Sequence, residues 1–596
     1  MSKSARHELE IAFVAVALLL AGVSILAEAA PTADASPDAV LASEPLFSTT
    51  SLVKPNMLLD LSVEFPTTGA AHRKAFDIRK SYVGYWDPMG CYDYSTASDG
   101  YFKRASAATV SNGEIVCANK WSGNLLNWAA SSAIDMLRYA MTGGDRVSDT
   151  ASATLLQRAV LRADFYRNSS YFPIHSLTGN LDKLTPLVAS KVVAAGGTIH
   201  ISNCRDRLFI GPTAIGGSCD EPGDGQLYGP SGTAASYGAR VEVCSAEEGP
   251  LRGDLCQQYP NGNYKPVGTI QKYSDAMRFA AFGYLMDNTN GRYGGVLRAP
   301  MKFTGATSRN DRFEKIANEA AEWDSSTGVF AANPLKAAEG ASGVVNYLNR
   351  FGRTSPTPGI YKELDPVGEL YYESLRYLQG QPPTPQAAAA MTDRMKDGFP
   401  VYNGTEKWGE GDRRGWDPIV SSCQRNYALV IGDLNTHHDK SLPGLVTDDL
   451  DGWKGARPVE AQEPDAAFWT KILGAYENNE TLEYPDPAGR KKLTTRGNAQ
   501  GPRSFAYNNG AQITSKDIAT MKTGSDQGSF GWAGLAYWAN TQAIRGTIRN
   551  CASRHSPSTS MNVVTARSGR ASVVARSISL RSTVALTTGT TMAIRS

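Results

Sequence analysis

Several residues that could bind a metal ion stand where apolar strands of this chain are expected to end. Met57–Leu61 is a short apolar run that contains Asp60. Ser62 and Glu64 follow this run, and a second apolar run ends at Asp433. Open α/β sheets place ligands at the carboxyl ends of such buried parallel strands. Carboxylate and hydroxyl oxygens are the ligands that Mg²⁺ and Ca²⁺ take in proteins. Asp60, Ser62, Glu64 and Asp433 are therefore candidate ligands of Mg²⁺ or Ca²⁺, although we favour the interpretation that they cap loops at the sheet edge.

The residues after the second acid suggest a different chemistry. Asp433, His437 and Asp439 combine imidazole and carboxylate groups, which are common ligands of zinc and iron. A secreted metal-dependent hydrolase that uses these three residues is therefore an alternative function. However, His437 and His438 would point to opposite faces of a strand, and no HExxH, nucleophile-elbow or phosphate-loop motif accompanies them. We interpret the segment as a solvated loop and expect no enzymatic activity.

Two further groups of residues could contact a partner. Arg252-Gly253-Asp254 lies between Cys244 and Cys256 and could present its carboxylate to a receptor, although exposed loops often carry such residues by chance. The aromatic cluster Tyr85, Trp86, Tyr92 and Tyr94 could form an interaction patch, because aromatic side chains dominate binding hot spots. Packing around Cys91 explains the same cluster equally well.

The eight cysteines are informative because the amino terminus resembles an export signal. Ile11–Ala27 is apolar or small throughout, and Ala27-Glu28-Ala29 offers a cleavage pattern, so residues 1–29 are a predicted signal peptide; an uncleaved anchor is the alternative. Disulfides persist outside the cytoplasm. Pairing of neighbours is the simplest prediction, although other connectivities remain open. The predicted pairs are Cys91–Cys117, Cys204–Cys219 and Cys244–Cys256, with Cys423 and Cys551 unassigned.

The elements that must position these residues follow from hydrophobic periodicity. Met57–Leu61 and Tyr427–Ile431 are predicted buried strands, and Met277–Leu285 and Gly295–Pro300 are predicted to pair across an Asn288–Gly291 turn. Apolar residues at three- and four-residue steps predict one helix over Trp121–Ala140, stopped by two glycines, and another that begins with Asp365 as N-cap and Pro366 as first residue. Further helices are predicted around Val344–Phe351, Phe468–Tyr476 and Leu535–Ile544. Strands that alternate with helices indicate an α/β sheet.

Composition divides the chain into segments of different character. Residues 30–53 are rich in Ala, Ser and Pro and predict a linker, and residues 145–270 predict a β-rich insertion with disulfides. The net charge is +2, but Gly546–Ser596 holds seven Arg and no Lys, Asp or Glu, so the remainder carries about 2 − 7 = −5. That balance gives no indication of nucleic-acid binding. The biased segment 546–596 predicts disorder, and its abrupt onset suggests a shifted reading frame.

Eight short sequence motifs, in the same order along the chain, resemble the N-terminal half of the type IV pilus PilY1 family of tip-associated biogenesis factors and adhesins. They span about Lys54–Arg545: Pro55–Pro66, Gly84–Pro88 with Cys91-Tyr92, Trp121–Trp128, Asn263–Pro266, Gly294–Lys302, Asp365–Tyr372, Ser422–Gln424 and Gly534–Asn540. Asp60-x-Ser62 also resembles the start of the Asp-x-Ser-x-Ser metal loop of von Willebrand factor A domains, with Glu64 in the third position.

The resemblance implies a fold and a role. The fold would be a Rossmann-type α/β sheet of the von Willebrand A kind over residues 54–545, flanked by helices and carrying insertions. The family's C-terminal β-propeller with its calcium loop has no recognisable counterpart in this sequence. The role would be a secreted, non-enzymatic factor that contacts minor pilins or other pilus components and a host or abiotic surface. It would act in the periplasm or outer membrane, at the cell surface or at the pilus tip. A truncated copy, or an inert product of a frameshifted gene, is the remaining alternative.

Overall fold

The computed structural model has mixed α/β architecture and describes most of the chain from residue 53 onward. The described residues are 53–162, 165, 168–194, 196–215, 227–228, 234–287, 292–354, 358–404, 417–421, 424–432, 438–439, 441–445, 457–461, 463–477, 483–485, 491–493, 529, 531–545, 561–567, 573–576 and 583–586. The predicted signal peptide and the linker before residue 53, together with Cys219, Cys423, Asp433, His437 and Cys551, lie outside them.

A five-stranded sheet contains the predicted strand at Met57–Leu61 as its middle member. Across the sheet the strands are β18 (Val296–Lys302), β17 (Arg278–Gly283), β1 (Asn56–Leu61), β21 (Asn426–Gly432) and β24 (Met561–Arg567). Neighbouring strands are parallel except for the β17–β18 pair, which is antiparallel, as the sequence predicted for these two runs. Leu58 of β1 stands beside Ala280 on one side and Ala428 on the other, which gives the sheet an apolar centre.

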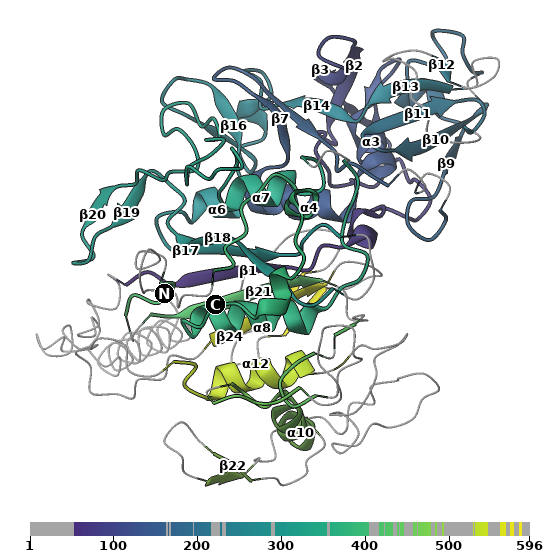
Figure 1. Cartoon of the computed structure of the whole chain (residues 1–596). Helices are drawn as coiled ribbons and strands as arrows, with labels where there is room; N and C mark the ends of the chain where they lie inside the picture. Colours follow the sequence, from purple (N-terminus) through teal and green to yellow (C-terminus); the bar gives the residue numbers. More distant parts are fainter. Residues whose placement is uncertain are drawn as a thin grey trace, which may run out of the picture. The chain divides into compact units, whose positions relative to one another are not determined.

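Helices cover both faces of this sheet (Figure 1). On one face, α4, α6 and α7 pack on Leu59 and Leu61 through Ile134, Ile270 and Val344. On the other face, α8 and α12 pack on Leu58 and Phe282. The helices are α3 (Gly123–Ala130), α4 (Ala133–Thr142), α5 (Leu181–Leu184), α6 (Thr269–Lys272), α7 (Val344–Arg350), α8 (Val367–Leu378), α9 (Asp393–Lys396), α10 (Ala466–Glu477) and α12 (Gly531–Thr541), with 3₁₀ turns at Phe65–Thr68, Gly249–Leu251 and Pro385–Ala388.

Two further sheets form a lobe between β1 and β17 in the chain. One has six strands in the order β6 (Trp121–Ser122), β2 (Gly90–Ser95), β3 (Tyr101–Ala107), β14 (Arg240–Val243), β8 (Thr154–Gln157) and β7 (Arg146–Asp149). The other has five, in the order β12 (Leu227–Tyr228), β13 (Ala234–Gly238), β11 (Arg207–Gly211), β10 (Thr198–Cys204) and β9 (His175–Thr178). The predicted insertion at 145–270 therefore shares a sheet with strands that precede it, a long-range pairing that periodicity cannot predict.

Five short hairpins complete the described strands. They are β4 (Thr109–Ser111) with β5 (Glu114–Val116), β15 (Cys256–Gln258) with β16 (Tyr264–Pro266), β19 (Thr307–Arg309) with β20 (Lys315–Ala317), β22 (Glu483–Pro485) with β23 (Lys491–Leu493), and β25 (Val573–Arg576) with β26 (Thr583–Leu586). Strands β24, β25 and β26 fall within 546–596, the segment for which the sequence predicted disorder. The physical reason for the difference is that Val- and Thr-rich runs favour strands, and β21 offers β24 an edge for parallel pairing.

Helix boundaries differ from the sequence prediction at two places. The single helix predicted over Trp121–Ala140 is two helices, because Ser131 and Ser132 have extended backbone and Ser132 begins α4 as a capping residue. Its hydroxyl accepts from the Asp135 amide at 3.3 Å, and the Asp135 carboxylate accepts from the Ser132 amide at 3.0 Å. In α8 the cap is Pro366 and not the predicted Asp365, so the helix begins one residue later than predicted.

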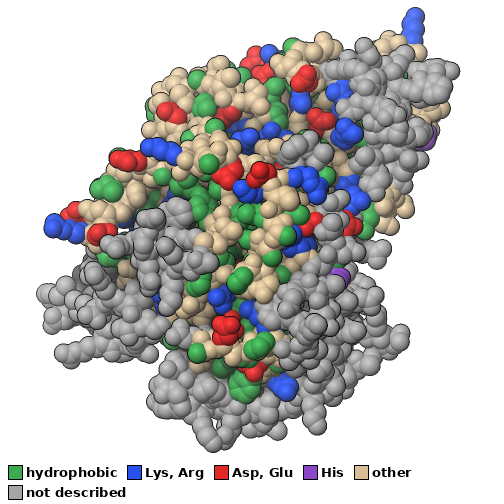
Figure 2. All heavy atoms as spheres, viewed as in Figure 1, with side chains coloured by type: hydrophobic (Ala, Val, Ile, Leu, Met, Phe, Trp, Pro, Cys, Tyr) green, Lys and Arg blue, Asp and Glu red, His purple; other side chains and the backbone are tan. Residues whose placement is uncertain are grey.

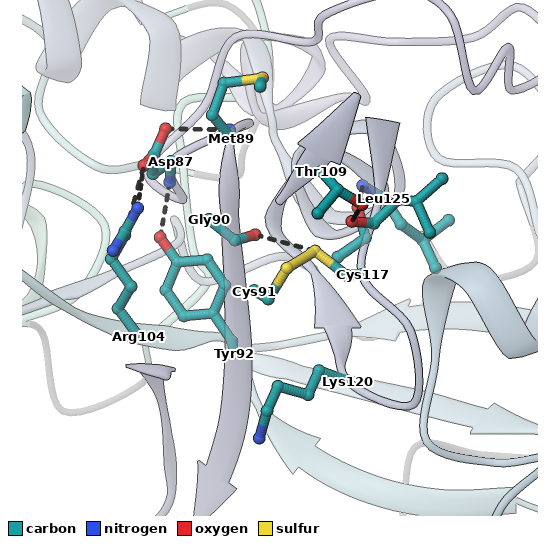
Figure 3. Close-up of a disulfide and its surroundings, with 12 residues drawn as sticks. Asp87, Met89, Gly90, Cys91, Tyr92, Arg104, Thr109, Cys117, Lys120 and Leu125 are labelled. Carbon is teal, nitrogen blue, oxygen red and sulfur yellow. Dashed lines mark hydrogen bonds and ion pairs between the residues drawn. A yellow bond between two sulfur atoms is a disulfide. The ribbon is translucent and has the colours of Figure 1, made fainter. Parts of the chain in front are cut away.

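Two predicted disulfides, Cys91–Cys117 and Cys244–Cys256, are confirmed in the lobe. Figure 3 shows the first of them. Cys204 is also disulfide-bonded, and its predicted partner Cys219 lies outside the described residues. Beside the first bridge, the Tyr92 hydroxyl accepts from the Asp87 amide at 2.7 Å, and Arg104 pairs with the Asp87 carboxylate at 3.4 Å.

The described surface carries charges of both signs. Figure 2 shows basic and acidic side chains interspersed over one face. Among the residues that the structure describes, none of the helices combines the length and the apolar character that a membrane crossing requires.

Candidate functional site

Asp60 lies on the face of the central sheet that α8 covers. Its side chain is fully buried, and one carboxyl oxygen accepts a hydrogen bond from the Ser374 hydroxyl of α8 at 2.8 Å. The other oxygen has no hydrogen-bond partner among the described residues. Burial disfavours the charged form and raises the pKa of Asp60 to about 8, and the Ser374 hydrogen bond opposes this only partly. The Asp60 carboxyl is therefore mostly protonated at neutral pH.

Ser62 is also committed to a protein contact. Its hydroxyl forms a 2.8 Å hydrogen bond with the hydroxyl of Tyr284, which follows β17. A side chain at Gly432, the last residue of β21, would approach the Ser62 Cβ to 2.7 Å. The close approach of β1 and β21 at this point requires glycine, and it leaves the Ser62 hydroxyl directed at Tyr284.

Glu64 and Lys362 lie side by side at the same edge. Their backbones form an isolated parallel bridge, and both side chains are buried. The Lys362 ammonium lies 5.9 Å from the centre of the Tyr284 ring. A buried ammonium is costly unless opposite charges surround it. Nothing in the sequence singles out Lys362, because a single lysine before a helix carries no periodic or motif signal.

Two buried acids, Asp439 of the predicted hydrolase set and Glu369, hold the first turns of α8 in place. One Asp439 oxygen accepts from the Glu369 amide at 3.1 Å, which satisfies an unpaired donor at the start of the helix. The Glu369 carboxylate in turn accepts from the amides of Gly294 at 2.8 Å and Ser441 at 2.9 Å. Asp365, just before the helix, is fully buried as well.

These contacts decide how well the described residues fit a divalent cation. Mg²⁺ needs near-octahedral oxygen ligands. The Asp60 carboxyl is hydrogen-bonded to Ser374 of α8, and the Ser62 hydroxyl is hydrogen-bonded to Tyr284. Among the described residues, no group of three or more His, Cys, Asp or Glu side chains is placed to hold a metal, and Asp433 lies outside that part of the chain. The described members of the predicted loop do not fit such an ion.

The residues of the predicted hydrolase site are only partly described. Asp433 and His437 lie outside the described residues. Asp439 is fully buried and caps α8, so the one described member of the set supports a helix.

The predicted contact residues are mostly internal. The Arg252 guanidinium is buried, pairs with Glu248 at 2.9 Å and donates to the Tyr139 hydroxyl at 3.1 Å. Only Gly253 and Asp254 are exposed, so the three residues are not displayed together. In the aromatic cluster, Tyr85, Trp86 and Tyr92 are at most 1% exposed and belong to the core of the lobe. Packing is therefore the role that these rings have here.

An open cavity of about 530 Å³ is lined by residues of the lobe and by Arg353 and Pro358, which follow α7. Arg240 lines this cavity and pairs with Asp99 at 3.3 Å and with Asp206 at 3.2 Å. Arg353 is held by Asp145 through hydrogen bonds of 2.8 and 2.7 Å. Because internal carboxylates already pair with these two arginines, the lining gives little indication of one ligand class.

Comparison with known proteins gives consistent results along the chain. The family model for the "PilY1 homolog, small alpha/beta domain" matches residues 73–208, and the model for the "PilY1 homolog, second domain" matches residues 284–539. A type IV pilus biogenesis factor PilY1 homolog of Xylella fastidiosa (strain Temecula1) is 35% identical over 422 residues, which is 65% of this chain and 33% of the relative. A second homolog from that strain is 27% identical over 419 residues, or 61% of this chain and 26% of the relative.

The chain thus spans about a third or less of the length of the curated relatives that it matches. No solved structure is significantly similar to it.

Proposed function

The chain belongs to the PilY1 family, and from that premise we propose that it is an exported type IV pilus biogenesis and tip-associated factor. It acts by contact with minor pilins or other pilus components and with a host or abiotic surface. The observation that carries the proposal is the 35% identity over 422 residues with a protein named as a pilus biogenesis factor. No catalytic step is part of the proposal.

The central sheet supports a von Willebrand A-like scaffold within this proposal. Numbered by position in the chain, its strands run 3-2-1-4-5 across the sheet. This follows the order of doubly wound nucleotide-binding sheets, which place their ligands at the carboxyl ends of the strands. The third strand, β18, is antiparallel and closes one side.

The lobe supports export. It holds the Cys91–Cys117 and Cys244–Cys256 bridges, and disulfides persist mainly in oxidising compartments. We propose that the lobe is a rigid, oxidised support and that the predicted signal peptide directs the chain to the periplasm or beyond.

Deletion and complementation in the native host test the function. Removing the locus should reduce surface pili, twitching and adhesion, and expression of residues 1–596 should restore them. A chain with Cys91→Ser and Cys117→Ser should restore less, because the lobe loses its bridge, whereas Ser106→Ala on the exposed end of β3 should restore fully. Unchanged piliation, twitching and adhesion in the deletion strain would contradict the proposal.

A further inference from the structure

The sequence motif Trp121–Trp128 holds a neighbouring surface segment in a fixed conformation. Residues 72–83, which we call the basic segment, form neither helix nor strand. Asn124 and Asn127 of α3 are fully buried, and their side chains bond the backbone of residues 80–86. Asn124 makes two of these hydrogen bonds, at 2.8 and 2.7 Å, and Asn127 makes three, at 3.1, 2.8 and 2.8 Å. The helix thus supplies the partners that an irregular backbone lacks.

The earlier part of the basic segment is fixed as well. The Trp128 indole donates to the Lys74 carbonyl at 2.8 Å, and the Phe76 ring packs on the Trp128 ring at a centroid distance of 5.3 Å. Gly84 follows the segment, and a Cβ there would lie 2.1 Å from the Asn127 Oδ1 atom. Only glycine permits this close approach of the backbone to α3. The segment is therefore ordered before any partner binds.

The exposed side chains of the basic segment are mainly cationic. It contains four basic residues and one acidic residue, Asp77. Arg79 lies 3.6 Å from Glu114, which also pairs with Lys183 at 2.8 Å, and Lys80 lies 3.2 Å from Asp77. Pairs at the surface are weak, so these cations remain available to a partner. All four basic residues are exposed, namely Arg73, Lys74, Arg79 and Lys80.

We propose that the basic segment is a preformed docking surface for an acidic stretch of a partner protein. It presents two basic pairs, Arg73-Lys74 and Arg79-Lys80, and such groups form strong charge-assisted hydrogen bonds with carboxylates. Because α3 already fixes the backbone, a partner does not have to order the segment when it binds. The assignment rests on the proposed function in one respect, which is that the partner is a protein component of the pilus.

A protein fits this surface better than a lipid membrane does. Segments that lie on membranes insert apolar and aromatic side chains below the headgroups. In the basic segment, Phe76, Ile78 and Tyr82 instead pack against the core of the lobe. Val83, which is 48% exposed, is the one large apolar side chain that this segment leaves at the surface.

Binding of a labelled octaglutamate peptide to the full, oxidised chain tests the proposal. Fluorescence anisotropy should be measured with the wild type, with Lys74→Glu/Lys80→Glu, and with Arg312→Glu/Lys315→Glu, whose side chains are exposed on the β19–β20 hairpin. The two double variants have the same net charge, so unspecific attraction is matched. We expect the first to bind at least about tenfold more weakly than the wild type and the second to bind within about twofold of it.

Asn127→Ala tests whether α3 positions the segment, because it leaves every cation in place. It removes three hydrogen bonds to the backbone. Below the onset of its thermal unfolding, we expect several-fold weaker peptide binding and faster cleavage by trypsin after Lys74 and Lys80 than in the wild type. If Asn127→Ala does not fold, Asn124→Ala, which removes two of the hydrogen bonds, takes its place.

Several results would overturn the proposal. A wild type that does not bind the peptide, or two double variants of equal affinity, would show that the basic segment is not the docking surface. If Lys74→Glu/Lys80→Glu lost binding to phosphatidylglycerol vesicles but not to octaglutamate, the segment would belong to a lipid surface. Unchanged affinity in the folded asparagine variant would show that α3 does not preform the surface. These measurements use purified protein, so their failure is distinguishable from a failure of the piliation test.

Discussion

Asp60, near the carboxyl end of the central strand, is the residue whose surroundings most affect the chemistry of this edge. Asp60 has apolar neighbours along β1 and is covered by α8, and among the described residues its carboxyl accepts a hydrogen bond from Ser374. Its pKa of about 8 follows from that burial. The sequence identified Asp60 correctly as a strand residue near the candidate site, but it could not show that a helix more than 300 residues later in the chain covers the carboxyl, since the Ser374 contact spans 314 residues.

Replacement of this acid should change how stability depends on pH. The unfolded Asp60 ionises near pH 4 and the folded one near pH 8, so between these values the folded state holds the extra proton and wild-type stability falls as pH rises. Asp60→Asn removes this dependence. Urea unfolding should show the variant gaining on the wild type by up to about 1.4 kcal/mol per pH unit from pH 5 to 8. A difference that does not vary with pH would show that Asp60 titrates normally.

The buried network around Asp149 is a second prediction about single residues. Asp149 pairs with Arg146 at 2.8 Å and with Lys265 at 3.0 Å, and the cation side chains are at most 1% exposed. Asp149→Asn leaves two buried cations without their carboxylate and should cost about 3 kcal/mol in unfolding free energy.

The exposed pair Lys315–Asp275, at 3.1 Å, provides the control for this experiment. Asp275→Asn should cost less than about 1 kcal/mol, because solvent screens the pair. Equal losses in the two variants would mean that burial does not govern the Asp149 network.

At the level of elements, local patterns predicted strands β1 and β21, the β17–β18 pair and helices α7 and α8. Their apolar spacing is independent of distant contacts. The buried acids of α8 escaped prediction, since Glu369 and Glu373 lie off its apolar face and would ordinarily be solvated. The structure buries both, and Glu373 accepts from the Tyr293 hydroxyl at 2.8 Å. The break between α3 and α4 was not predicted either. Two serines within an apolar repeat are compatible with a continuous helix, so the pattern does not indicate a break.

The capping box of α4 provides a test of that break. Ser132→Ala removes the hydroxyl that accepts from the Asp135 amide and donates to its carboxylate at 2.6 Å. The loss should be about 1–2 kcal/mol of unfolding free energy. Ser106→Ala, at an exposed position of β3, should change it by less than about 0.5 kcal/mol. A Ser132→Ala chain as stable as the Ser106→Ala control would mean that the box does not hold α4.

For the whole molecule, the two family matches do not coincide with independent folding units. The second match begins at residue 284, after β1 and β17 have already passed in the chain. These are the middle strand and its neighbour in the central sheet. The sequence predicted the α/β class from strand–helix alternation, but not which strands become neighbours, because pairing depends on contacts between distant segments.

A fragment restricted to residues 284–539 should therefore fail to fold. It lacks β1 and β17, so β21 would expose the edge that β1 normally pairs, and such edges promote aggregation. Circular dichroism and denaturant unfolding should show no cooperative transition for the fragment and a clear one for the full chain. Cooperative unfolding of the isolated fragment would contradict the role given to β1.

The position of β1 between β17 and β21 also sets an order of events during folding. Asn56 meets Arg278 across 222 residues of chain and Asn426 across 370. Contacts of such separation form slowly, whereas the two described disulfides join cysteines only 26 and 12 residues apart. The lobe can thus become oxidised and compact first. Strand β1 remains unpaired until β17 and β21, which lie later in the chain, have formed. Until β21 arrives, this apolar strand is exposed to aggregation or to a chaperone that binds extended segments.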